Sequence, residues 1–272
     1  MSLTPHLPPL AKIEQKTLVD LIAGGKRLDE RSATDYREMK IEVGVIDKAE
    51  GSAQVHLGKT KIMVGVKVDA GEPFLDTPDQ GVLTVNAELV PLASPEFEPG
   101  PPGENAIELA RVVDRGIRES GAIDIKKLCV IPGKKVYVIF VDVYVLDHDG
   151  NLIDAAAIAA FAALLNAKIR KYELSGETVT FTSEYEPLPI QNYPSTITTV
   201  KIGNSLIIDP SLGEENVAEA RLTVTVDKDD KICAMQKGGL GTFTRKEVET
   251  TVANAIAKSG EIRQKILEAA NR

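Results

Sequence analysis

Three arginines share one face of a segment whose apolar residues recur with helical spacing, over residues 104–119. At about 100° per residue, Arg111, Arg115 and Arg118 fall within roughly 60° of one another, opposite the apolar stripe. A guanidinium can hold a phosphate through a forked pair of hydrogen bonds. Three of them in a row on a rigid helix could therefore bind successive phosphates of a nucleic acid.

The same segment offers each arginine a carboxylate three or four residues away, which is the spacing of neighbours on a helix surface. The pairs are Glu108 with Arg111, Asp114 with Arg118, and Glu119 with Arg115. Ion pairs within the helix would occupy all three positive charges. Spacing alone favours this interpretation over phosphate binding, and it leaves phosphate binding open as the alternative.

A group of carboxylates, Glu214, Glu215 and Glu219, precedes a predicted strand within residues 209–224. Clustered carboxylates can hold Mg²⁺ or act as general acids and bases. Arg221 follows directly and would neutralise one of them. A solvated loop is therefore the favoured interpretation.

Two further turns could hold ions. Residues 146–154 are acidic, but a calcium loop counted from Asp147 would need glycine and glutamate where Leu152 and Ile158 stand. Residues 237–242 (KGGLGT) lie where phosphate loops occur, between a strand and a helix, but they lack the P-loop ending and the dinucleotide fingerprint. We expect an acidic strand-to-helix turn and a glycine turn. The helix after the second turn has a capping box, formed by Thr244 and Glu247.

The elements that must position these side chains alternate between helical and strand-like patterns, which indicates an α+β fold. Residues 10–23 form an amphipathic pattern, and four short runs rich in valine and isoleucine follow between residues 39 and 90. The apolar residues of the first helix are Ile13, Leu18, Leu21 and Ile22. The proline-rich residues 94–105 form a rigid lead-in to the arginine-bearing helix.

The second part of the pattern contains one long apolar strand and one apolar helix. Residues 136–147 are almost continuously apolar, which is typical of a strand in the centre of a sheet. The helix from about residue 152 is apolar nearly all round, so we expect it to lie between two layers. Residues 173–196 are rich in turn formers and predict a boundary. The predicted parts are a helical lead-in at 1–30, a first half at 31–186 and a second half at 187–272.

The composition limits the classes of function. The chain has 272 residues, 43% of them apolar, and a formal net charge of −8. It can bury a large core, but it lacks the net positive charge of proteins that bind nucleic acid by themselves, so any RNA contact must be local or shared with a more basic partner.

The same composition predicts an intracellular protein. Cys129 and Cys233 lie far apart in apolar runs, and we expect two buried, free thiols. Residues 1–10 lack a signal-peptide pattern, and the longest apolar run, residues 155–165, is too short to span a membrane. We therefore expect a soluble, cytoplasmic protein.

Over nearly the whole chain, the order of these segments resembles the RNase PH family. Arg27-Leu-Asp29-Glu-Arg31 is similar to the family's early Arg-x-Asp-Gly-Arg motif, with Glu30 in place of glycine, and residues 51–60 match its first hairpin. More specifically, residues 76–125 and the sequence DPSLGEE resemble the non-catalytic ring subunits of the archaeal RNA-degrading exosome. The resemblance implies an RNase PH-like α+β fold, with two related halves of the ribosomal protein S5 domain 2-like type and helices packed on mixed sheets.

The resemblance also implies partners. In such exosomes, three copies of this subunit and three copies of a catalytic RNase PH-like subunit form a hetero-hexameric ring, a trimer of heterodimers, which carries RNA-binding cap proteins. Single-stranded RNA enters the channel and is shortened from its 3′ end by phosphate attack. No cofactor and no metal ion are implied.

Departures from the family pattern imply that this chain has no catalytic residues of its own. Active members carry an arginine pair where this chain has Glu104 and Asn105, and a phosphate-binding Gly-Ser-Arg where it has residues 149–151 (Asp-Gly-Asn). Their two catalytic aspartates align with Glu215 and Arg221. An arginine cannot act as a general acid near neutral pH.

The family pattern supports the phosphate-binding interpretation for two of the three arginines. Positions matching Arg111 and Arg115 contact the RNA backbone at the site of the neighbouring catalytic subunit, whereas Arg118 has no such match and keeps the ion-pair interpretation. The leading hypothesis is a non-catalytic subunit that helps to structure the active site and contacts RNA. The alternatives are an independently active phosphorolytic 3′–5′ exoribonuclease and a small-molecule kinase of related half-fold, against which the missing glycine-rich phosphate loop argues.

Overall fold

The computed structural model describes residues 9–176 and 178–271, and the burial of side chains from residue 15 onward. The helices are α1 (Pro9–Ala23), η1 (Pro91–Ala93, a 3-10 turn), α2 (Glu104–Glu119), α3 (Leu152–Asn166), α4 (Leu212–Val217) and α5 (Arg245–Ala269). The strands of the first half are β1 (Met39–Val43), β2 (Gly51–Leu57), β3 (Thr60–Gly71), β4 (Val82–Leu89), β5 (Cys129–Ile131) and β6 (Lys135–Asp147). The remaining strands are β7 (Lys168–Ser175), β8 (Thr178–Pro187), β9 (Ser195–Ile202), β10 (Ser205–Ile208), β11 (Ala220–Val226) and β12 (Ile232–Gly238). The expected α+β class is confirmed.

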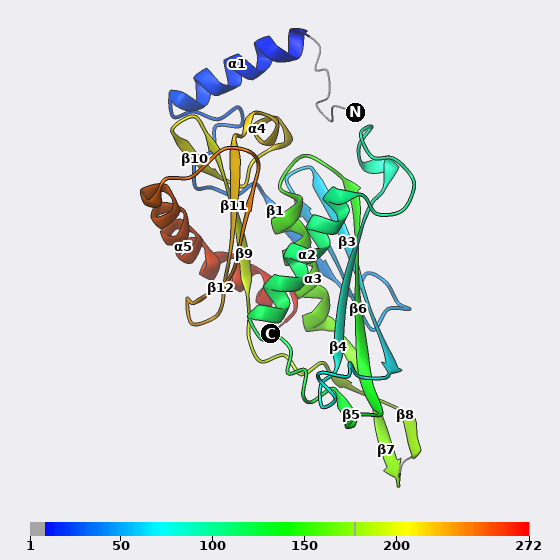
Figure 1. Cartoon of the computed structure of the whole chain (residues 1–272). Helices are drawn as coiled ribbons and strands as arrows, with labels where there is room; N and C mark the ends of the chain where they lie inside the picture. Colours follow the sequence, from blue (N-terminus) through cyan, green and yellow to red (C-terminus); the bar gives the residue numbers. More distant parts are fainter. Residues whose placement is uncertain (1–8, 177, 272) are drawn as a thin grey trace.

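The first sheet has the strand order β1-β2-β3-β6-β4, with β5 paired to the start of β6 (Figure 1). Strand β6 pairs antiparallel with β3 on one side and parallel with β4 on the other. Its apolar side chains on one face are buried along the whole strand. The predicted central position of residues 136–147 is therefore confirmed.

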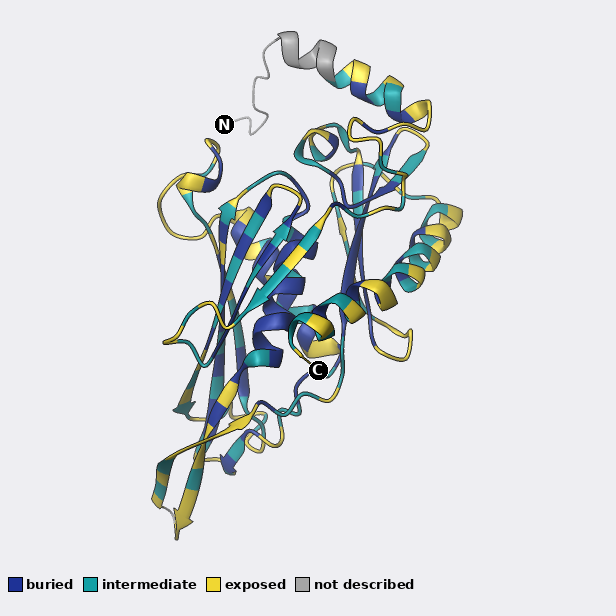
Figure 2. Ribbon diagram, turned by 180° about the vertical axis from the view of Figure 1, so that it is seen from behind, coloured by how far each residue is buried: buried dark blue, intermediate teal, exposed yellow. Residues whose placement is uncertain are grey.

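The second sheet is antiparallel, with the order β10-β9-β11-β12, and α3 lies between the two sheets (Figure 1). Twelve of the 15 residues of α3 are buried, and Figure 2 shows the helix mostly in the buried colour. Gly51 of β2 allows the end of α3 to approach closely, because a Cβ on Gly51 would lie 2.4 Å from the carbonyl oxygen of Ala163. The predicted sandwiched helix is confirmed.

The first helix packs on the second sheet. Leu18 and Ile22 of α1 are buried against Val200, Ile202 and Ile207 of β9 and β10. The predicted amphipathic helix is confirmed, although the side chain of Ile13 lies outside the described part of the structure. The expectation that residues 1–10 contain no signal peptide falls mostly on residues 1–8, which also lie outside the described residues. The lead-in thus joins the chain's beginning to its second half, and the three-part division at residues 30 and 186 stays a proposal.

The turn-rich structure predicted at residues 173–196 is wrong in its first part, where the chain forms strands. Strands β7 and β8 form a two-stranded hairpin that projects from the body, mostly exposed (Figures 1 and 2). The three prolines that suggested a boundary stand at the end of β8 or beyond it, where they remove no hydrogen bond within the hairpin. The middle of the hairpin is held by aromatic packing of Tyr137 against Tyr172 and Phe181.

Both cysteines are free, as expected, although each is partly exposed and not fully buried. In the part of the chain that the structure describes, no helix is both long and apolar enough to cross a bilayer. The capping box that begins α5 is confirmed: the Thr244 side chain accepts from the Glu247 N–H, and the Glu247 carboxylate accepts from the Thr244 N–H at 2.6 Å.

Candidate functional site

Helix α2 presents two arginines to an open groove beside β12. The groove has a volume of about 350 Å³. Its lining residues are Glu104, Ile107, Glu108, Arg111, Val112, Arg115 and Gln236. The helix is fixed in this orientation because its opposite face buries Leu109, Val113 and Ile117 in the core between the sheets.

The two groove arginines have little to neutralise them. Arg111 is exposed and makes no hydrogen bond or ion pair with the described residues. Arg115 donates from Nη2 to the side-chain oxygen of Gln236, a neutral partner, and its buried Nε has no partner in the described structure. Both guanidiniums therefore keep their charge available to an anion in the groove.

The predicted ion pairs within α2 are confirmed for one arginine only. Arg118 lies 2.6 Å from Asp114 and also donates to the carbonyl oxygen of Leu83 at 2.9 Å. For Arg111 and Arg115 the prediction is wrong, because neither is paired with its helical neighbour among the described contacts. Arg111 is unpaired in the described part of the chain because of a tertiary contact: Nη2 of Arg221, 113 residues away from Glu108, donates to the Glu108 carboxylate at 2.7 Å.

The solvated acidic loop predicted before β11 is wrong for two of its three carboxylates. Glu214 is buried and forms a two-point ion pair with Arg27, at 2.8 Å to Nε and 2.6 Å to Nη2. Glu215 is partly buried, and it accepts a hydrogen bond at 2.9 Å from the backbone N–H of Asn151. Only Glu219 is exposed as expected, where it accepts from a neighbouring backbone N–H.

The turn at Asp149-Gly150-Asn151 is packed under the segment that follows β10. Gly150 has a φ of +87°, and a Cβ on it would lie 2.4 Å from the carbonyl carbon of Ser211. The carbonyl oxygen of Asp149 accepts from the Leu212 N–H at 3.1 Å. The predicted strand-to-helix turn is therefore confirmed, but it is enclosed and has little space for a ligand.

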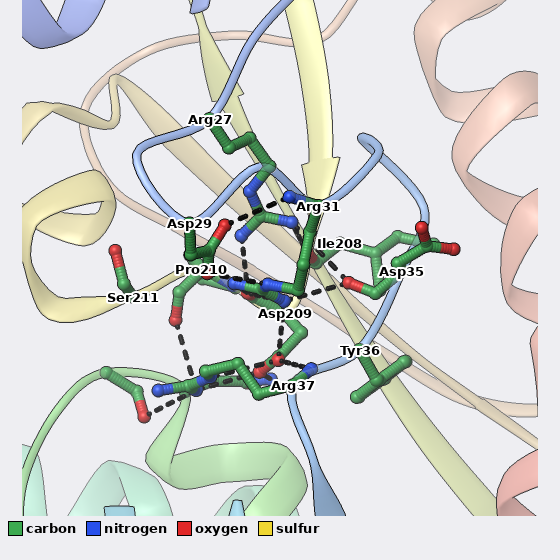
Figure 3. A network of polar contacts seen from close by, with 12 residues as sticks. Arg27, Asp29, Arg31, Asp35, Tyr36, Arg37, Ile208, Asp209, Pro210 and Ser211 are labelled. Carbon is green, nitrogen blue, oxygen red and sulfur yellow. Dashed lines mark hydrogen bonds and ion pairs between the residues drawn. The ribbon is translucent and has the colours of Figure 1, made fainter. Parts of the chain in front are cut away.

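A buried aspartate that the sequence reasoning missed ties this turn to residues 31–37. Asp209 accepts hydrogen bonds from the backbone N–H, Nε and Nη2 of Arg37, from Nη1 of Arg31 and from the amide of Asn151. Burial by itself would raise the pKa of Asp209, but the hydrogen bonds and charge of Arg37 outweigh it and hold the pKa below its usual value. Figure 3 shows Arg27, Arg31 and Arg37 converging on this residue and its neighbours.

The available signals for this cluster were the Arg27-x-Asp29-x-Arg31 motif and the aspartate that begins DPSLGEE. Gln236 and Arg37 had no such signal.

The glycine turn predicted at residues 237–242 is confirmed, because Gly239 and Gly241 lie directly against the backbone of Glu219. In the described part of the chain, no three histidine, cysteine, aspartate or glutamate side chains are grouped to hold a metal ion.

Two carboxylates beside the enclosed turn have raised pKa values. Burial raises the pKa of Asp154 to about 6, against the hydrogen bonds from Tyr36, Asn151 and Thr198. The protein atoms around the Glu215 carboxylate exclude water from it and so raise its pKa to about 7, although the hydrogen bond from the Asn151 N–H and the charge of Arg221 lower it. Both groups bind protons more readily in the folded chain than in the unfolded chain.

This shift predicts a pH-dependent effect of Glu215→Gln. A carboxylate with a raised folded-state pKa stabilises fully below its unfolded pKa, and that contribution is lost as the pH rises from about 4.5 to about 7. Glutamine can still accept from the Asn151 N–H but does not titrate. Denaturant unfolding should therefore show the variant gaining stability relative to wild type between pH 5 and pH 8. An unchanged difference between the two proteins would contradict this.

Comparison with known proteins places the chain in one family. Residues 35–170 match domain 1 of the 3′ exoribonuclease family, RNase PH, and residues 192–258 match its domain 2. The two matched segments follow one another in the order of the family's domains. They contain the first sheet and the second sheet respectively.

The chain is also similar to the exosome complex component Rrp42 of Thermococcus kodakarensis, 56% identical over 265 residues that cover 97% of each chain. Among solved structures it resembles a chain of the Archaeoglobus fulgidus exosome with RNA bound to the active site, with 45% identity, a TM-score of 0.88, and coverage of 95% of this chain and 99% of that chain. An archaeal exosome core gives 43% identity and a TM-score of 0.84, covering 94% of this chain and 97% of that chain. The RNase PH-like fold expected from the sequence is thus confirmed, and the chain belongs to the RNase PH proteins of the 3′ exoribonuclease family.

Proposed function

We propose that this chain is a ring subunit of an archaeal exosome, that it is not catalytic by itself, and that it binds the RNA backbone through Arg111 and Arg115. The relatives named as exosome components and the exosome structures that it matches along nearly the whole chain support the assembly. The observation that carries the RNA role is the pair of arginines left uncompensated in an open groove.

The enclosed turn supports the non-catalytic part of the proposal. Phosphate attack on RNA needs inorganic phosphate held by N–H donors and positive charge. Here the Asn151 N–H donates to the Glu215 carboxylate, and Gly150 lies against Ser211 with no space for an anion. Arg221 stands where active relatives are expected to have a catalytic carboxylate, and it is engaged with Glu108.

The groove has the features of a shared RNA site. Arg111 and Arg115 are four residues apart on one helix, so they lie about 6 Å apart along its axis and one strand can meet both. Gln236 orients Arg115 without removing its charge. Two arginines held close together in this way allow a chain of net charge −8 to contact RNA locally when a partner supplies the rest of the site.

The proposed partners are a catalytic RNase PH-like subunit in a hetero-hexameric ring, RNA-binding cap proteins and single-stranded RNA. The proposed location is the cytoplasm, with which two free cysteines agree, since cytosolic thiols are kept reduced. The bound RNA named for the matched Archaeoglobus structure supports RNA as the ligand of such an assembly.

A phosphorolysis assay tests this function. The purified chain is incubated with single-stranded RNA and inorganic phosphate, alone and after mixing with the catalytic RNase PH-like subunit of the same organism, while particle mass is measured in parallel. We expect no nucleoside diphosphate from the chain alone, and both release of nucleoside diphosphate and a hexameric mass from the mixture. Phosphate-dependent release by the chain alone, or a chain that stays monomeric in the mixture, would refute the proposal.

A further inference from the structure

We propose that Arg221 is a positioning residue: it draws Glu108 away from Arg111 and so keeps Arg111 free for an RNA phosphate. This inference rests on the proposed function, because it concerns how the groove keeps its charge. Arg221 lies on β11 and reaches α2 from the second sheet. It would otherwise be explained only as the remnant of a lost catalytic position.

Glu108 is placed to neutralise Arg111. The two residues are three positions apart on α2, where side chains of opposite charge are neighbours and pair on an isolated helix. In the folded chain Glu108 instead lies 2.7 Å from Nη2 of Arg221. Arg111 is consequently without an ion pair among the described residues, although a carboxylate stands one helical turn away.

The structure holds Arg221 in the position that makes this possible. Gly238 on the paired strand β12 leaves room for the guanidinium, since a Cβ there would lie 2.9 Å from Nη2 of Arg221. Arg221 is 25% exposed and its Nε is buried without a partner in the described structure, so Glu108 is its one hydrogen-bonded counterion there. The Glu215 carboxyl group also interacts electrostatically with Arg221. The guanidinium is therefore a fixed competitor for Glu108.

Loss of Arg221 would change the groove in two ways. Glu108 could turn to Arg111 and compete with phosphate for it, and its carboxylate would repel an approaching phosphate. We expect Arg221→Gln to weaken binding of single-stranded RNA by the assembled ring roughly 3- to 10-fold, although Arg221 itself need not touch RNA.

A double-mutant cycle separates positioning from simple loss of charge. Rings that contain Arg221→Gln, Glu108→Gln or both are compared with wild type by RNA affinity in phosphate-free buffer, with ring mass as the assembly check. We expect Glu108→Gln to bind at least as tightly as wild type, and the double variant to match Glu108→Gln within about two-fold. A loss from Arg221→Gln of equal size in both backgrounds would mean that Arg221 acts through its own charge and would overturn the inference.

The cycle remains decisive if Arg221→Gln alone does not assemble, because the double variant leaves no carboxylate unpaired and is compared directly with Glu108→Gln. Arg221→Lys, which keeps a cation for Glu108, should bind RNA within about two-fold of wild type; a loss as large as that of Arg221→Gln would count against the pairing.

Arg111→Ala distinguishes a failure of the proposed function from a failure of the positioning role of Arg221. If Arg111→Ala has no effect on binding, the proposed function fails; if it weakens binding but Arg221→Gln does not, only the positioning role fails.

Discussion

Replacing Arg111 and Arg115 together by alanine is expected to weaken RNA binding by the assembled ring by about 100-fold or more. A hydrogen bond to a charged group contributes about 1.5–3 kcal/mol, so two lost phosphate contacts amount to at least about 3 kcal/mol, or more than two factors of ten. The ring should remain assembled, because Arg111 has no described partner in the chain and Arg115 bonds only to Gln236. RNA affinity and particle mass are the two measurements.

Arg118→Ala is the matched control for this experiment. Arg118 lies on the same helix face, one turn further on, but its guanidinium is held by Asp114 at 2.6 Å. Its replacement should cost less than about 1 kcal/mol of stability and leave RNA affinity within two-fold of wild type. Equal losses from the control and from the double variant would show that the effect comes from general charge and not from the two groove arginines.

Asp209→Ala is expected to lower the free energy of unfolding by about 3–5 kcal/mol, because it removes the buried carboxylate that pairs with both Arg37 and Arg31 and leaves Arg37 the more distant Asp149, at 3.7 Å. Asp209 is fully buried, and its oxygens accept from Arg37 and Arg31 at 2.8–3.0 Å. Since a domain's whole stability is about 5–15 kcal/mol, the variant should be poorly folded or markedly less stable. Denaturant unfolding of the isolated chain measures the change.

Two variants make this result specific. Asp209→Asn suits the left-handed backbone at this position, where φ is +49°, and so isolates the loss of charge from backbone strain. Asp29 is the other carboxylate bound to Arg31, and its side chain is 43% exposed. Asp29→Ala should therefore lower the free energy of unfolding by less than about 1 kcal/mol. If Asp209→Ala cost no more than Asp29→Ala, the buried cluster would not hold residues 31–37 to the second half.

Local patterns in the sequence were sufficient to predict the helices and strands that position the groove. The apolar spacing of residues 104–119 matches α2, and the apolar character of residues 136–147 and 152–166 matches a central strand and an enclosed helix. These features depend on the neighbours of each residue along the chain. They could be predicted because burial on one face, on two faces or all round leaves a distinct pattern.

Partner choice could not be predicted, because it depends on residues far apart in the sequence. Spacing along α2 assigned Glu108 to Arg111, whereas the fold brings Arg221 to it. In the same way, its position in an acidic segment predicts that Glu214 is solvated, whereas Arg27, 187 residues away, forms an ion pair with it in the folded chain. The β7–β8 hairpin was missed for a different reason: the prolines at 187, 189 and 194 indicated turns, although Val179, Phe181 and Tyr185 alternate with polar residues along β8.

The distribution of charge is consistent with both parts of the proposed function, the absence of phosphorolysis by the chain alone and the contact with RNA. Glu215 occupies the N–H of the turn that would have to hold phosphate, and Arg221 engages the carboxylate nearest to Arg111. The same departures that argue against phosphorolysis therefore protect the positive charge of the groove. In the proposed function, RNA binding depends on these two guanidiniums and on the neighbouring subunit.

The salt dependence of RNA binding tests the phosphate contacts most directly. The affinity of assembled rings for single-stranded RNA is measured over a range of salt concentrations, with wild-type chain and with the Arg111→Ala, Arg115→Ala variant. Each phosphate contact to a single strand adds about 0.7 to the slope of log affinity against log salt, so we expect the variant's slope to be shallower by about 1.4. An unchanged slope would mean that these arginines do not neutralise RNA phosphates.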